Sequence, residues 1–159
     1  MGSQATVSLQ LLRIIDQAYN RKSWHGTNLR GAIRGLTPHQ TEWRPRPDRH
    51  NIHELVVHAA YWKYAVANRL ARGRRGAFAL KGSNWFTRNA SARQWSEDVA
   101  LLEAHRVQMR ELGEVDAERK GADEPSRAQK MRLRRIAREE GLLGTRAEEL
   151  AGAIEAEGT

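Results

Sequence analysis

The sequence contains no cysteine among its 159 residues. This absence excludes disulfides, zinc sites built on cysteine and thiol nucleophiles. There is also no apolar run of about 18 residues of the kind that spans a membrane, and the N-terminus lacks the segments of a secretory signal. The length and an apolar content of 40% suit one domain over residues 1–159, so we expect a cytoplasmic protein with no membrane partner.

Two further absences concern the pattern of the chain. No Phe, Trp or Tyr occurs in the 64 positions after Trp95, and the last histidine is His105. No segment alternates apolar and polar residues with period two between turn signals, so strands are not expected. The apolar residues recur instead at three to four positions, which predicts an all-α fold.

The most informative stretch runs from Asn51 to Arg72 and is predicted to form a helix of about five turns. Asn51 and Glu54 have the spacing of a capping box. An apolar stripe at helical spacing is predicted to be buried. It consists of Leu55, Ala59, Trp62, Val66 and Leu70. His58 lies beside this stripe, so an ionisable ring is expected to face an apolar interior.

Three other segments are predicted to be ordered. The first helix begins near Ser8 and continues to about Leu36, with an irregularity at Gly26. Thr37 and Pro38 open a short turn, with Trp43 packing it on the body. A third helix begins at Asn89 or Ser91 and ends near residue 112. It follows a connection of about 18 residues, which is longer than usual and therefore functional or mobile.

The C-terminal part has a different character. Residues 1–116 carry 18 Lys and Arg against 10 Asp and Glu, whereas residues 117–159 carry nine of each. Only thin apolar stripes follow, in predicted helices at 131–140 and from Thr145. Residues 116–159 are therefore interpreted as a divergent polar segment.

Several local features together resemble one known family. These are Tyr19 followed by Trp24-His25-Gly26, then Leu36-Thr37-Pro38 with Trp43-Arg44-Pro45, and finally the run from Asn51 to Trp62 that ends His58-Ala59-Ala60-Tyr61-Trp62. Over residues 8–112 the chain is similar to the DinB/YfiT-like proteins. The resemblance implies an up-down four-helix bundle that holds nickel or zinc with three histidines. His58 matches the ligand of the second helix, and a His-x-x-x-His on the last helix supplies the other two. Relatives include thiol-dependent transferases, and they are often dimers.

The chain departs from that pattern at the last helix, because no His-x-x-x-His is present. Two explanations are open. The tail is either a divergent fourth helix in a protein that has lost the metal, or a replaced segment that leaves the core to be covered by a partner chain.

Candidate metal ligands are therefore His58 and His25, the second lying late in the first helix. The alternative for His58 is a neutral core histidine bonded to a neighbour. Glu54 could orient the His58 ring, although the capping box is the preferred interpretation. His53 points about 140° away from His58 on the helix, so the two cannot share a metal.

The remaining candidates are weaker. His39 and His50 are expected in solvent, and His105 at the rim of the fold. A basic cluster accompanies no known reading motif, so nucleic acid is an unlikely partner and a solvated helix end explains it. Its members are Arg69, Arg72, Arg74, Arg75, Lys81 and Arg88.

Two functions follow from the sequence. The first is a DinB-like metal-dependent protein of unassigned reaction, with an incomplete nickel or zinc site. The second is a non-enzymatic helical module that binds or dimerises through an apolar surface, with an anionic partner at the basic cluster. A homodimer is expected in either case.

Overall fold

The computed structural model describes residues 2–23, 26–72, 76–82, 84–89 and 91–121, together with positions 128, 131, 132 and 135. Its helices are α1 (Gly2–Tyr19), α2 (Leu29–Ile33), α3 (Pro38–Glu42), α4 (Ile52–Leu70) and α5 (Ala92–Gly121). No strand occurs in these ranges; one isolated bridge joins Ser23 and Gly26. The all-α bundle predicted from the sequence is confirmed.

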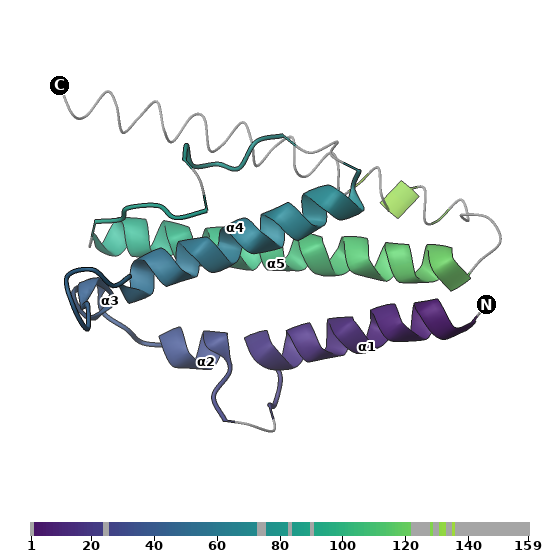
Figure 1. Cartoon of the computed structure of the whole chain (residues 1–159), viewed down its shortest axis with the longest axis horizontal. Helices are drawn as coiled ribbons and strands as arrows, with labels where there is room; N and C mark the ends of the chain where they lie inside the picture. Colours follow the sequence, from purple (N-terminus) through teal and green to yellow (C-terminus); the bar gives the residue numbers. More distant parts are fainter. Residues whose placement is uncertain are drawn as a thin grey trace.

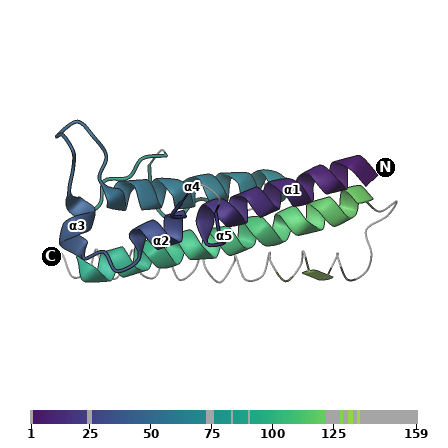
Figure 2. The same ribbon diagram turned by 90° about the horizontal axis from the view of Figure 1, so that it is seen from below.

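The helix α5 packs along both α4 and α1 (Figures 1 and 2). Side chains at the start of α4 meet the start of α5, as in the pair His53 and Asp98, and Ala67 near the end of α4 meets Met109. These two helices therefore run in the same direction, while α1 runs opposite to them. The segment between α4 and α5 returns along the bundle, which explains its length and replaces a simple up-down order.

The helix starts are set by side-chain caps. Asn51 accepts a hydrogen bond from the Glu54 amide while Glu54 reaches back to the Asn51 amide, so the predicted capping box opens α4. Thr37 and Gln40 form a second capping box at α3, with Pro38 as first helical residue. At α5, the hydroxyl of Ser91 accepts from the amide of Gln94. Local chemistry thus fixes these boundaries.

Two helices have different lengths from those predicted. The first helix starts at Gly2 and ends at Tyr19, and Asn28 caps the separate helix α2 by accepting from the amide of Gly31. The third long helix continues past residue 112 to Gly121. Its additional turns bury Val115 and Ala117, so tertiary packing extends it.

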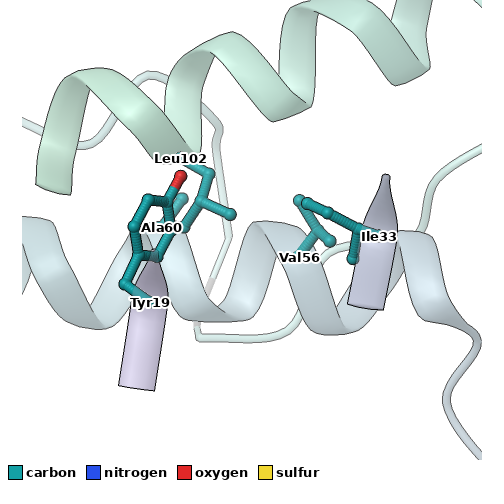
Figure 3. Packing of buried hydrophobic residues seen from close by; sticks show 5 residues of the cluster. All are labelled: Tyr19, Ile33, Val56, Ala60 and Leu102. Atoms are coloured by element: carbon teal, nitrogen blue, oxygen red, sulfur yellow. The ribbon is translucent and has the colours of Figure 1, made fainter. Parts of the chain in front are cut away.

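The main core lies where α1, α2, α4 and α5 meet. Figure 3 shows Leu102 of α5 next to Tyr19 and Ala60, with Val56 pointing toward Ile33. A second cluster of Ala67, Met109 and Leu112 lies further along α4 and α5. The two helices therefore contribute to both core clusters.

The buried face of α4 differs from the predicted one. The buried residues are His53, Glu54, Val56, Val57, Ala60 and Ala67. Leu55, Trp62 and Val66 are 48%, 45% and 41% exposed. The prediction was wrong for these three residues, because it favoured the larger apolar side chains and the packing uses smaller ones. Ala59 and Leu70 of the predicted stripe do pack against the core clusters. Trp43 was also expected to pack inward, and it is 64% exposed.

Little of the C-terminal segment is described. Arg132 donates to Glu114 at 2.6 Å, which places this position beside the second half of α5. The helices predicted at 131–140 and from Thr145 otherwise lie outside the described residues. Within the described ranges, no helix is long and apolar enough to cross a membrane.

Candidate functional site

His58 lies in the middle of α4, and both of its ring nitrogens are engaged. Nδ1 is 2.7 Å from the carbonyl oxygen of Asn84, and the indole Nε1 of Trp62 is 3.1 Å from Nε2. A carbonyl can only accept and an indole N–H can only donate. The ring is therefore neutral, with its proton on Nδ1 and its lone pair on Nε2 directed at Trp62.

The indole of Trp85 stacks on two histidines. Its centroid is 3.8 Å from the His58 ring and 3.5 Å from the His50 ring, with interplanar angles of 9° and 2°. Two nearly parallel rings at these distances would overlap if they lay on one face of the indole. Trp85 is consequently held between His58 and His50, one on each face, and this fixes the connection between α4 and α5 against α4.

His58 belongs to a partly exposed face of α4, which we call the α4 strip. Its members, at successive helical turns, are Leu55, His58, Trp62 and Val66. Because three of them are large apolar side chains with more than 40% of their area exposed, His58 does not face the apolar interior predicted for it.

Glu54 acts at the start of α4, and its carboxylate binds groups other than the His58 ring. Its carboxylate takes two hydrogen bonds from Arg44, one of them 2.8 Å long, and a third contact of 3.1 Å comes from His50 Nδ1. The bonds from Arg44 lower the pKa of Glu54, with His50 and the Asn51 amide adding to them and burial opposing them. The preferred reading of Glu54 as a cap is confirmed.

A buried charged cluster joins α4, α5 and the connection between them. His53 Nε2 is 2.6 Å from Asp98 Oδ2, and both residues are almost fully buried. Arg88 donates two further bonds to Asp98, at 2.7 and 2.8 Å. In the described part of the chain, His53 Nδ1 has no hydrogen-bond partner.

This cluster was missed in the sequence, where Arg88 was assigned to the basic cluster. Asp98 lies in the second turn of α5, which starts at Ala92. A signal was present: Asp98 shares a helical face with Trp95 and Leu102, and His53 shares one with Val56. A polar residue on each of two buried stripes predicts that they pair.

The other sequence candidates have mixed outcomes. His25 lies outside the described residues, as do Arg74 and Arg75. His39 and His50 are exposed as expected. His105 was expected at the rim but is only 8% exposed, with Nδ1 3.1 Å from the Gln108 side chain. His105 is buried because it lies on the same face of α5 as the buried residues Leu102 and Met109.

A three-histidine metal centre does not fit the described residues. No group of three or more His, Asp or Glu side chains converges among them. The Nε2 lone pair of His58 faces Trp62, and the rings of His50 and His53 bind Glu54 and Asp98. A convergent set of three ligands is therefore absent from the described part of the chain.

The described part of the chain is an all-α bundle with a histidine near the middle of its second long helix. The family model of the DinB superfamily matches residues 22–139, so the chain belongs to the DinB superfamily. The resemblance seen in the sequence covered residues 8–112. The family match begins later, at residue 22, and extends further, to residue 139. No curated protein and no solved structure matches the chain.

Proposed function

We propose that this protein is a binding module of the DinB superfamily that pairs with a second copy of itself through the α4 strip. The observation that carries the proposal is the exposure of Leu55, Trp62 and Val66, each above 40%, on one face of a helix. Burying such side chains contributes about 25 cal/mol per Å² of apolar surface. Burial of these side chains in an interface would therefore stabilise the dimer relative to the monomer.

The spacing of the strip suits another helix. Leu55, His58, Trp62 and Val66 follow one another at three, four and four residues, so they lie along one face that a second helix can cover. In a two-fold symmetric dimer, the same surface of each subunit forms the interface. The α4 strip of one copy would therefore pack on the α4 strip of the other. Trp62 supplies the large aromatic anchor that interfaces favour at their centre.

The helix α1 presents a second exposed apolar stripe, which offers a matched control. Val7, Leu11 and Ile14 are all exposed at similar helical spacing. This stripe carries no aromatic residue, whereas the α4 strip is continuous with the stacked Trp85. We therefore place the pairing surface on α4 and use α1 to test its position.

The test measures the mass of the full chain by light scattering over a range of concentrations. The wild type and Leu11→Lys are expected to be dimers, and Val66→Lys a monomer with unchanged helical circular dichroism. A charge buried in the interface without a partner costs several kcal/mol, which shifts the equilibrium to monomer. A monomeric wild type, or a Val66→Lys variant as dimeric as the wild type, would overturn the proposal.

Metal binding is a second candidate, favoured by one specific contact. The Nδ1–H of His58 is held by the Asn84 carbonyl, an arrangement that typically orients histidine ligands of metals. Nickel or zinc would bind at Nε2, with His25 as the expected second ligand. The competitor for that lone pair is the indole N–H of Trp62.

Calorimetric titration with zinc or nickel tests this candidate. Since a hydrogen bond contributes about 0.5–1.5 kcal/mol, Trp62→Phe is expected to raise metal affinity by up to about tenfold. His58→Ala is expected to abolish binding, while His39→Ala, at an exposed position of α3, leaves it unchanged. Equal affinities in wild type and His58→Ala, or no binding in any variant, would remove this candidate.

A further inference from the structure

The charges of the C-terminal part are separated along the sequence. Residues 117–159 carry nine Lys and Arg and nine Asp and Glu, yet six of these cations and none of the carboxylates fall within residues 127–138. We call this stretch the basic segment. Its cations are Arg127, Lys130, Arg132, Arg134, Arg135 and Arg138. A balanced net charge over residues 117–159 therefore includes a block of positive charge.

The described positions of the basic segment lie beside the second half of α5, and all of them are helical. Arg132 lies 2.6 Å from a carboxylate oxygen of Glu114 and 3.7 Å from one of Glu118. Arg135 lies 3.7 Å from a carboxylate oxygen of Glu111. Because the contacted position on α5 falls as the residue number rises from 132 to 135, the chain runs antiparallel to α5 here.

These three carboxylates do not neutralise the basic segment. The six cations outnumber them by three, and Glu114 is also bound by Arg110. The side chain of Arg135 remains 58% exposed. Five of the six cations are arginines, which stay charged at any physiological pH. The basic segment therefore carries a positive charge that α5 does not balance and that an anionic partner can bind.

We propose that the basic segment binds the phosphate backbone of nucleic acid without reading its sequence, and that Glu111 and Glu114 restrain it by occupying two of its arginines in the free protein. Guanidinium groups bind phosphate through paired hydrogen bonds, so the abundance of arginine suits this partner. A phosphate backbone would compete with the carboxylates of α5 for Arg132 and Arg135. This interaction goes beyond the pairing function proposed above and does not depend on it.

Charge density favours nucleic acid over a lipid surface. At the helical rise of about 1.5 Å per residue, the basic segment extends about 18 Å. A duplex presents one charge per about 1.7 Å of its axis, or about ten charges over that length. Aromatic side chains favour the surface of a membrane, but the chain has none after Trp95. A dense array of phosphates is therefore the surface that this segment fits.

The basic segment is separate from the basic cluster between Arg69 and Arg88, on which the sequence prediction against nucleic acid rested. In that cluster, Arg88 is bound to the buried Asp98. The two sets of cations provide a matched comparison, because removing two charges from either set changes the net charge of the protein equally.

Fluorescence anisotropy tests the proposal with the full chain and a labelled DNA duplex of about 20 base pairs, between about 50 and 200 mM salt. Each phosphate contact steepens the dependence of log affinity on log salt by about 0.9, which is about eightfold in affinity near 0.1 M. Lys130→Gln with Arg134→Gln is expected to lose about this factor for each charge. Arg69→Gln with Arg72→Gln is expected to bind almost as tightly as the wild type.

A second pair of variants tests the restraint by α5. Glu111→Gln with Glu114→Gln frees both restrained arginines, so it is expected to bind the duplex up to about eightfold more tightly for each arginine released. Glu97→Gln with Asp48→Asn removes the same charge from carboxylates that pair with other arginines, and it serves as the control. Circular dichroism checks that every variant keeps its helical content.

Three results would rule out nucleic acid as the partner. These are no binding of the duplex, equal losses in the two variants that remove cations, and tighter binding to phosphatidylserine vesicles than to the duplex. The restraint is excluded if Glu111→Gln with Glu114→Gln binds the duplex no more tightly than its control does.

Discussion

Single residues of this protein take their roles from the groups that face them. His58 and His53 lie five positions apart on α4, yet one bonds to a backbone carbonyl and an indole while the other bonds to a buried carboxylate. Lys63, on the same helix, has its Nζ 5.6 Å from the centroid of the Tyr19 ring. The residue type alone would not have predicted that the His58 ring donates from Nδ1 and accepts at Nε2.

Glu54 gives a prediction at this scale. Its pKa is lowered in the folded state, chiefly by Arg44, so its contribution to stability is complete above the unfolded pKa of about 4.3. It is lost as the pH falls through the folded value. Glu54→Gln is expected to lower the free energy of unfolding by about 1–3 kcal/mol at pH 7, and by progressively less below pH 4.

Urea denaturation at pH 7 and at pH 3 measures this difference. Asp48→Asn removes the same charge from a carboxylate whose side chain is 69% exposed, and it serves as the control. The expectation fails if Glu54→Gln and Asp48→Asn have the same stability at pH 7, or if the deficit of Glu54→Gln grows as the pH falls.

At the scale of elements, the connection between α4 and α5 is held at two points. Asn84 and Trp85 are fixed by His58 and His50, and Arg88 is fixed by Asp98. The contacts of Asn84 and Trp85 involve only α4 and the residue His50 before it, whereas Arg88 binds Asp98 of α5, which also contacts His53 of α4. We call these two attachments the clamp. The connection was expected to be either functional or mobile, and its described residues are tied to the bundle.

Asp98→Asn tests the clamp. Removing one partner of a buried charged cluster costs about 3–5 kcal/mol, because Arg88 and His53 lose their common acceptor. We expect a fall in the free energy of unfolding of this order, together with faster amide exchange in residues 84–89. Glu97→Gln, one position earlier, removes a carboxylate paired with the exposed Arg93 and should cost less than about 0.5 kcal/mol. Comparable losses in the two variants would show that the clamp is not as described.

At the scale of the whole molecule, the outstanding feature is apolar surface outside the core. The exposed stripes of α1 and α4 are larger than scattered surface residues would account for. If the α4 strip pairs two copies, dissociation is coupled to unfolding, and the melting temperature of the wild type rises with protein concentration. That of Val66→Lys is then independent of concentration, which complements the mass measurement.

The sequence was sufficient for the features that depend on neighbours in the chain. The capping box at Asn51 and the helix start at Thr37 were predicted correctly, as were the all-α class and the family, because caps and helical spacing are local properties. The buried face of α4 could not be predicted, since two apolar stripes competed and only the approach of α5 selects Val56, Val57 and Ala60. The partners of His53, His58 and Lys63 come from distant segments for the same reason: contacts across the bundle exist only after the helices have packed.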